Sequence, residues 1–189
     1  MVEKLSEVPA QANTADADES VALCCVQQPQ AFAELYRRYE MRVYRFLLVR
    51  VGNAHDAQDL TSQTFVAAFE GIRSYAGKGV FAAWLFGIAR RKLADHFRHY
   101  ERALPLDDAA NQPHPGQSLD QMTHERLQIN QITQALRHIA PDRAEALSLR
   151  IFGELGSAEI AVLMNKSDAA VRMLVHRAIE DIRKIVGAG

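Results

Sequence analysis

The chain of 189 residues contains only two cysteines, Cys24 and Cys25, and they are adjacent. Because adjacent cysteines cannot connect distant segments, a disulfide-stabilised secreted scaffold is excluded and a reducing compartment is expected. The sequence also lacks any run of about 20 apolar residues, the length that a membrane-spanning helix requires. Its first residues lack the apolar segment of a secretory signal. We therefore expect a cytoplasmic protein without a membrane span.

The chain carries almost no net charge, −1 at pH 7, but its charges are unevenly distributed. Residues 31–100 contain eleven basic and six acidic residues, whereas residues 1–30 contain one and five. A basic block beside acidic segments indicates one surface for a polyanion. Because neutralising phosphates supplies most of the non-specific affinity for DNA, a chain with so little net charge is expected to need a helper protein on DNA.

The prolines divide the chain. Three of the six prolines lie between residues 104 and 120, and proline interrupts a helix, so we expect a flexible linker over residues 101–126. The linker separates a first domain over residues 21–100 from a second over residues 127–189, each with a small core of its own. Residues 1–20 are rich in alanine and acidic residues without periodicity, which predicts a disordered tail.

Both domains are predicted to be helical. Over residues 31–51, apolar side chains recur every three or four positions, as in an amphipathic helix: Phe32, Leu35, Tyr36, Tyr39, Val43, Phe46 and Leu47. No segment alternates apolar and polar residues in the manner of a strand. The expected fold is therefore all-α, with two small helical domains joined by a flexible linker.

A second helix, predicted over residues 54–72, has an acidic side. At 100° per residue, Asp56, Asp59, Gln63 and Glu70 gather on one side of this helix, away from its apolar residues. One interpretation is a solvated acidic face. The other is a docking stripe for a basic partner protein, because charge complementarity favours both the orientation and the rate of association.

Residues 73–99 combine a glycine-containing loop with a helix that carries aromatic and basic residues. Trp84, Arg91 and Arg98 are seven residues apart and therefore lie along one stripe of this helix. Such a stripe suits single-stranded or distorted nucleic acid, because bases stack on the ring and phosphates pair with the guanidinium groups. The alternative places Trp84 in the core, which still leaves the arginines facing solvent or a partner.

Residues 157–178 have the spacing of a helix–turn–helix, the most specific pattern in the chain. Asn165 stands where the turn needs a left-handed residue, and Ser167 is a suitable N-cap for the second helix. The N-terminal half of a recognition helix enters the major groove. We expect Arg172 and Met173 to contact bases, and Lys166 and Arg177 to contact phosphates. The full set of side chains presented to DNA is Lys166, Arg172, Met173, His176 and Arg177.

A metal or enzyme site is not expected. His96 and His99 share a helix face, but no Cys, Asp or third His supports them as metal ligands. The chain has no glycine-rich phosphate loop, H-E-x-x-H motif or nucleophile elbow. We therefore expect no cofactor and no catalysis.

The order of these parts resembles an extracytoplasmic-function (ECF) sigma factor, a small member of the sigma-70 family of bacterial transcription initiation subunits. The resemblance is carried by D-A-x-D-L from Asp56, W-L-x-x-I-A-R from Trp84, and E-I-A, V-R and H-R-A between Glu159 and Ala178. Any one of these motifs alone would be weak, but their combination and order are specific. They cover residues 30–100 and 127–186.

The resemblance implies partners and roles for the same residues. The acidic stripe of Asp56, Asp59 and Gln63 would bind the clamp coiled coil of RNA polymerase core, and the flap of the core is a further contact. The loop and helix that would capture and melt the minus-10 promoter element contribute Ser74, Tyr75, Lys78, Trp84, Arg91 and Arg98. The helix–turn–helix residues would read the minus-35 element. Many members of this group are also held inactive by an anti-sigma factor.

One rival function uses the same helix–turn–helix. A free-standing repressor would dimerise and bind duplex DNA without polymerase. It would need a dimer surface, whereas the acidic stripe and the flexible linker call for neither dimerisation nor a palindromic operator. The sequence therefore favours the sigma factor.

Overall fold

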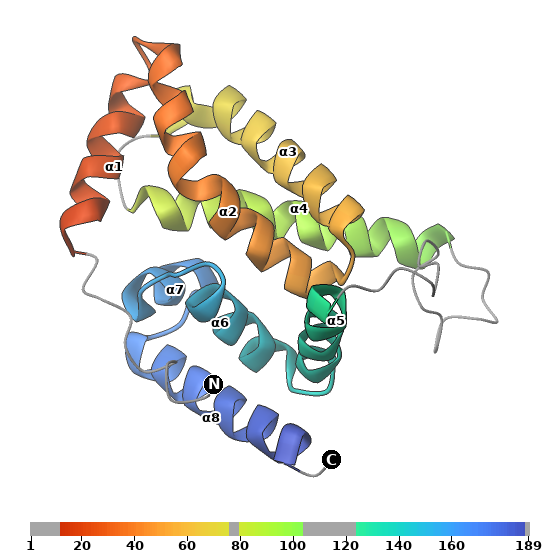
Figure 1. The fold of residues 1–189 in the computed structure, drawn as a ribbon. Helices are drawn as coiled ribbons and strands as arrows, with labels where there is room; N and C mark the ends of the chain where they lie inside the picture. Colours follow the sequence, from red (N-terminus) through yellow and green to blue (C-terminus); the bar gives the residue numbers. More distant parts are fainter. Residues whose placement is uncertain (1–11, 76–79, 104–123, 188–189) are drawn as a thin grey trace.

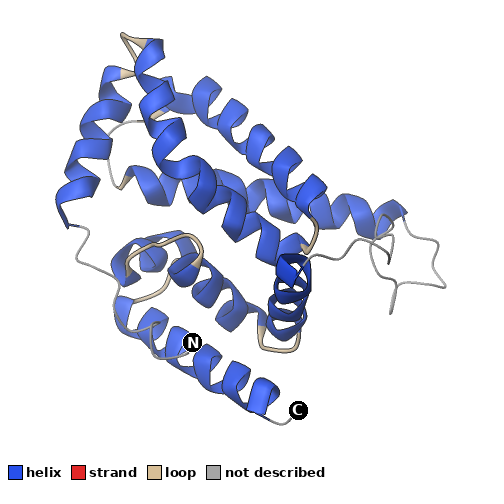
Figure 2. Ribbon diagram, viewed as in Figure 1, coloured by secondary structure: helices blue, strands red, loops and turns tan. Residues whose placement is uncertain are grey.

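The computed structural model of the chain describes residues 12–75, 80–103 and 124–187. These residues form eight α-helices and two short 3₁₀ helices, and no strand occurs among them (Figures 1 and 2). The prediction of an all-α fold is therefore confirmed.

The first half of the chain forms the upper helices of Figure 1. Gly52, at φ 85°, ends α2 in the left-handed conformation that glycine adopts without strain. The Asn53 side chain then accepts a hydrogen bond from the backbone N–H of Asp56 and starts α3. The elements are α1 (Ala12–Cys24), η2 (Pro29–Ala31), α2 (Phe32–Val51), α3 (Ala54–Gly71), η3 (Ile72–Ser74) and α4 (Phe81–Ala103).

The second half forms the lower helices of Figure 1. Pro141 begins α6 at a position where its missing N–H costs no helix hydrogen bond. The elements are α5 (His124–Arg137), α6 (Pro141–Ile151), α7 (Ser157–Met164) and α8 (Asp168–Gly187). Most of the predicted linker, residues 104–123, lies outside the described residues.

The prediction of a disordered tail over residues 1–20 is wrong for residues 12–20, which belong to α1. The reason is a tertiary contact with α2. Asp18 is buried and accepts hydrogen bonds from the Tyr39 hydroxyl and from Arg38. Burial, followed by the hydrogen bond to Asp18, raises the pKa of Tyr39. The acidic residues that suggested a solvated tail therefore include one that attaches α1 to the core.

Replacing Asp18 with alanine is expected to lower the free energy of unfolding by about 1–3 kcal/mol, because the buried Tyr39 hydroxyl loses its acceptor. The same Arg38 also pairs with Glu34, which is exposed. Glu34→Ala is therefore the matched control, with an expected loss below about 0.5 kcal/mol. Urea unfolding measures both variants, and equal losses would contradict a special role for Asp18.

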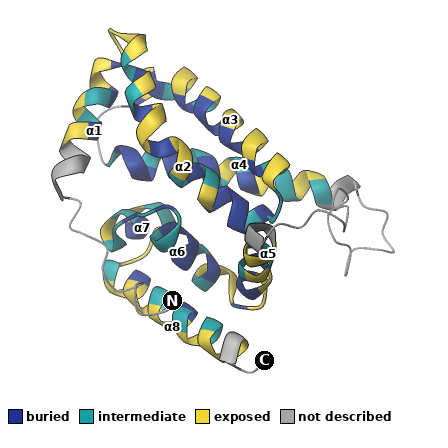
Figure 3. Cartoon of the chain, in the orientation of Figure 1, coloured by how far each residue is buried: buried dark blue, intermediate teal, exposed yellow. Residues whose placement is uncertain are grey.

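The two halves do not keep separate cores, contrary to the expectation from the sequence. Phe46 of α2 and Phe86 of α4 belong to one buried cluster with Leu149, Leu155 and Ile160 of the second half. Figure 3 shows buried residues on both the upper and the lower helices. A second, smaller cluster likewise joins Val49 of α2 to side chains of α5, α6 and α8. Each of the two clusters thus contains buried side chains from both halves.

A turn between α6 and α7 fits closely against the first half. Gly153 has no room for a side chain, because a Cβ atom would lie 2.7 Å from the carbonyl oxygen of Leu149 and 2.9 Å from Phe86 Cε1. The guanidinium group of Arg42 donates hydrogen bonds to the carbonyl oxygens of Gly153, at 2.8 and 3.0 Å, and Glu154, at 3.0 Å. One arginine of α2 therefore holds the turn that leads into the helix–turn–helix.

Candidate functional site

The predicted helix–turn–helix is present as α7, a tight turn and α8. Asn165 has φ 52° and ψ 50°, the left-handed conformation that the turn requires. The backbone N–H of Lys166 returns to the carbonyl oxygen of Ala161 at 2.9 Å, and the Ser167 hydroxyl accepts from the N–H of Ala170 at 3.2 Å. These contacts fix the angle between the helices and leave the first turns of α8 on the surface.

The N-terminal half of α8 separates a buried side from an exposed one, as predicted. Val171 and Ala178 are fully buried against the core. The outward side chains are Arg172, Met173, His176 and Arg177. The side chain of Met173 is 49% exposed, a large exposed fraction for an apolar residue. The structure therefore brings these four predicted residues together on one open face.

Three of the predicted basic residues of the helix–turn–helix are paired within the chain. Arg172 forms an ion pair with Asp168, one turn earlier on α8. Lys166 Nζ lies 3.0 Å from Asp142 Oδ2, and His176 Nε2 lies 3.5 Å from Glu180 Oε1. Exposed pairs of this kind contribute at most about 1 kcal/mol. They orient the side chains but yield easily to a phosphate or a base edge.

The acidic stripe of α3 divides into a structural part and a surface part. Asp56 Oδ2 accepts a hydrogen bond from the Asn53 amide and lies 3.7 Å from Nε2 of His96 on α4. Asp59 and Gln63 are exposed, and the Gln63 amide donates to Asp59 Oδ2 at 2.7 Å. Asp56 therefore lies half-buried at the junction of α3 and α4, while Asp59 and Gln63 form the accessible part of the stripe.

An exposed apolar side chain on α3 extends this surface, and sequence reasoning did not identify it. Val66 is 58% exposed and lies on the same side of the helix as Asp59 and Gln63 by helical spacing. Phe69, assigned to the apolar side from the sequence, is 47% exposed. The sequence feature that could have identified Val66 is its position as an apolar residue within an acidic stripe, a combination typical of a binding surface.

The aromatic part of the predicted nucleic-acid stripe forms a cluster at the start of α4. The Trp84 ring centroid lies 5.2 Å from that of Tyr75 and 5.6 Å from that of Phe81. Tyr75 is buried, and burial raises its pKa to about 12. Trp84 remains half-buried, so one side of its ring packs and part of it stays accessible. The packing of Trp84 agrees in part with the core interpretation, and its role on nucleic acid stays a prediction.

The remaining residues of the stripe lie around this cluster or further along α4. Ser74 is exposed, and its hydroxyl donates to the carbonyl oxygen of Gly71 at 2.7 Å. Arg91 is exposed, and Arg98 forms an exposed ion pair with Asp95. Lys78 lies outside the described residues.

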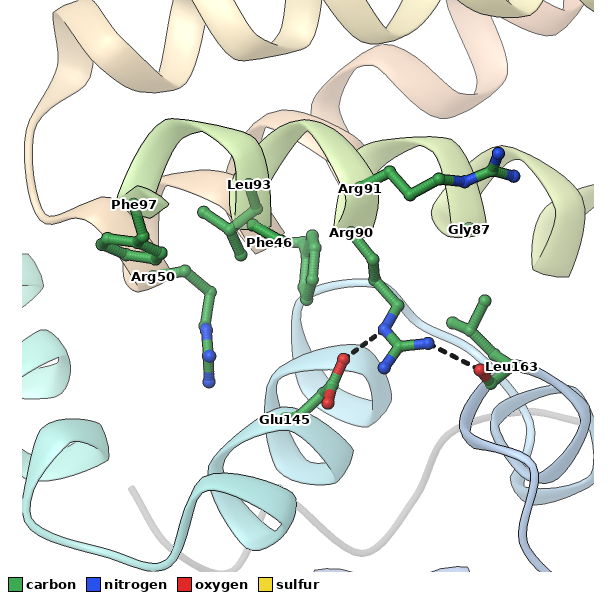
Figure 4. Close-up of a pocket in the computed structure, with 10 residues that line it drawn as sticks. Phe46, Arg50, Gly87, Arg90, Arg91, Leu93, Phe97, Glu145 and Leu163 are labelled. Carbon is green, nitrogen blue, oxygen red and sulfur yellow. Dashed lines mark hydrogen bonds and ion pairs between the residues drawn. The ribbon is translucent and has the colours of Figure 1, made fainter. Parts of the chain in front are cut away.

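Arg90, next to Arg91, connects α4 to the second half of the chain (Figure 4). It forms an ion pair with Glu145 of α6 and donates a hydrogen bond to the carbonyl oxygen of Leu163 on α7 at 2.6 Å. Leu163 also packs against Gly87 of α4. In this arrangement, the first helix of the helix–turn–helix rests directly on the helix that carries the nucleic-acid stripe.

No group of three or more His, Cys, Asp or Glu side chains that could hold a metal ion occurs in the part of the chain that the structure describes. His96 faces Asp56 instead. Within the same residues, the helices are all too short or too polar to cross a membrane.

Comparisons with known proteins match both halves of the chain. The family model Sigma-70 region 2 matches residues 35–103, and Sigma-70, region 4 matches residues 129–182. The ECF RNA polymerase sigma factor BldN of Streptomyces coelicolor is 31% identical over 180 residues, which are 91% of this chain and 68% of that protein.

Two solved structures have a similar fold. CnrH, in complex with the cytosolic domain of CnrY, matches with a TM-score of 0.70 and 22% identity, over 91% of this chain and 98% of that one. RpoE of Bartonella quintana, in complex with the anti-sigma factor NepR, matches with a TM-score of 0.63 and 19% identity, over 82% and 96%.

Proposed function

Because the chain belongs to the ECF group of the sigma-70 family, we propose that it binds RNA polymerase core and directs it to promoters. There it opens the duplex and allows transcription to start. The observation that carries the proposal is the open face of α8, where Arg172, Met173, His176 and Arg177 follow a left-handed turn at Asn165. The free-standing repressor is not favoured, because a second sigma region accompanies the helix–turn–helix.

The minus-35 element is read by α8 in the major groove. Arg172 donates to guanine edges, and Met173 packs against thymine methyl groups. Arg177 and Lys166 bind phosphates, which sets the position of α8 on the duplex. The exposure of these side chains and the weakness of their internal ion pairs support this role.

The polymerase core is held by α3. Asp59 and Gln63 offer acceptors to the basic residues of the clamp coiled coil, and Val66 adds apolar contact at the same surface. Asp56, half-buried beside His96, belongs to the same acidic stripe. The second region would contact the flap.

The minus-10 element is captured by the start of α4 and the loop before it. Unpairing bases costs a few kcal/mol per step, which stacking on an aromatic ring and pairing with arginines offset. The half-exposed Trp84 ring and the exposed Arg91 and Arg98 support this role. Ser74, Tyr75 and Lys78 are proposed to take part in it as residues of the loop.

The two promoter elements lie roughly 25 base pairs apart, about 85 Å along straight DNA at 3.4 Å per base pair. In the structure, α7 rests on α4 through Arg90 and Leu163, so the two DNA-binding surfaces are in one compact body. We propose that these regions separate when the chain binds polymerase and promoter. The compact arrangement is then the resting state of the free chain.

The role is one of binding and positioning in the cytoplasm, where the polymerase works, and it involves no catalysis by this chain. A regulator that stabilises the compact state would keep the chain inactive. RpoE of Bartonella quintana, whose fold is similar, binds an anti-sigma factor. We propose the same class of partner for this chain.

Purified chain mixed with core polymerase tests the proposal. We expect the two to co-elute in size-exclusion chromatography and to synthesise RNA from a cognate promoter, whereas core alone does not. A chain that binds duplex DNA tightly by itself and ignores core polymerase would overturn the proposal in favour of the repressor.

A further inference from the structure

A pocket of about 590 Å³ lies between the two sigma regions (Figure 4). Its walls come from α2 and α4 on one side and from Glu145 of α6 and Leu163 of α7 on the other. Pockets for small molecules commonly have volumes of about 300–1,000 Å³ and often form where two domains meet. The volume of this pocket lies within that range, and the pocket lies where two regions meet.

The pocket has more positive than negative charge. Three arginines line it, Arg50 of α2 with Arg90 and Arg91 of α4. The one carboxylate among its lining residues is that of Glu145, which is paired with Arg90. Arg50 has neither a hydrogen bond nor an ion pair to any residue in the described part of the chain, and Figure 4 shows its guanidinium group directed into the pocket. Burial lowers the pKa of Arg50; the charge of Glu145 opposes this shift, and the charge of Arg90 adds to it. A partly buried guanidinium without its own counter-ion favours an anionic occupant.

The rest of the pocket wall is largely apolar. Phe46 and Leu93 are buried beneath it, and Phe97 of α4 is half-buried at its side. Phe97 and Arg50 lie next to each other in Figure 4. The pocket thus places a guanidinium group beside a surface on which a ring or an acyl chain can pack.

We propose that this pocket binds a small organic anion, an aromatic or acyl group that carries a phosphate or carboxylate, with its anionic end on Arg50. Arg50 would hold the anion with two parallel hydrogen bonds. The apolar part of the ligand would pack against Phe97 and Leu163.

The position of the site gives it a regulatory consequence, which rests on the function proposed above. Both regions line the pocket, so the ligand binds only while they are together. It therefore shifts the equilibrium toward the compact state by RT ln(1 + [L]/Kd) and opposes promoter binding. The site would couple the level of a small anion to transcription.

Titration of the free chain with 1-naphthyl phosphate, followed by calorimetry, tests the site without polymerase. We expect saturable 1:1 binding to the wild-type chain, at least tenfold weaker binding of the neutral 1-naphthol, and weaker binding of inorganic phosphate. Arg50→Gln should reduce the affinity for 1-naphthyl phosphate at least tenfold. Arg45→Gln is the matched control on an exposed position of α2 and should change it less than twofold.

Two further variants keep the test decisive if Arg50→Gln does not fold. Arg50→Lys preserves the charge but loses the planar pair of donors, so it should bind with intermediate affinity. Ala94→Phe, at an exposed position of the pocket wall, fills the pocket while keeping both arginines and should also weaken binding. Wild-type affinity in the Arg50 variants, or equal binding of 1-naphthol, would overturn the site.

The regulatory consequence has its own measurement. Saturating 1-naphthyl phosphate should reduce promoter-dependent RNA synthesis by core polymerase with the wild-type chain. Synthesis that is unchanged at saturation would overturn the regulation. Because ligand binding is measured on the free chain, failure of the site and failure of the proposed function give different results.

Discussion

Replacing Asp59 with lysine is expected to weaken binding to polymerase core at least tenfold while leaving the helical content of the chain unchanged. Asp59 is exposed and accepts a hydrogen bond from Gln63 on the same helix, so the fold does not depend on its charge. A lysine there would face basic residues of the clamp. Like charges across an interface slow association and disfavour the correct relative orientation of the two proteins. A tenfold loss corresponds to about 1.4 kcal/mol. Competition between the variant and labelled wild-type chain for core polymerase measures it.

The neighbouring glutamines on α3 provide a matched pair for the same surface. Gln63→Lys and Gln58→Lys each add one positive charge at an exposed position, but the two positions point in directions about 140° apart on the helix. We expect Gln63→Lys to weaken competition for core and Gln58→Lys to leave it nearly unchanged. Equal effects of the two substitutions would reject the assignment of this face.

Replacing Arg172 with alanine is expected to remove discrimination at a single base pair of the minus-35 element, by about 1–3 kcal/mol. Arg172 lies on the open face of α8, 69% exposed, and is held only by an ion pair with Asp168. Arg172 must give up this ion pair to contact a base. The free-energy cost is small, because exposed ion pairs contribute little. Binding of the holoenzyme to a set of promoters, each altered at one minus-35 position, measures the effect.

Arg183→Ala is the control for Arg172. It removes the same side chain from the same side of α8, but three turns further along, beyond the half of the helix that enters the groove. We expect no change in base preference for this variant. An equal loss on every promoter sequence after Arg172→Ala would instead identify Arg172 as a phosphate contact.

The helix–turn–helix was predictable from the sequence because its determinants are local. Asn165 tolerates the left-handed conformation, and Ser167 caps the next helix within three residues. The alternation of buried Val171 and Ala178 with exposed Arg172 and Met173 follows directly from 3.6 residues per turn. The all-α fold was predictable for the same reason.

For the acidic stripe of α3, the sequence predicted the side of the helix but not the residues of other helices that contact it. Helical spacing placed Asp56 with Asp59 and Gln63 correctly on one side of α3. Spacing within one helix carries no information on what lies opposite, and His96 of α4 faces Asp56. The same limit explains the wrong prediction for α1. Its composition is that of a solvated tail, but Asp18 accepts a hydrogen bond from Tyr39 of α2, a contact that the local sequence does not reveal.

The residues of the sequence alone determined the helices, the left-handed turn and the outward face of α8, because each depends on neighbours a few positions away. Only the tertiary structure decided that the two regions share a core, that Arg42 holds the carbonyl oxygens of Gly153 and Glu154, and that Arg50 faces a pocket. These contacts join residues separated by up to 112 positions. Such pairings depend on how apolar faces pack in three dimensions, and the spacing of residues along the chain does not specify them.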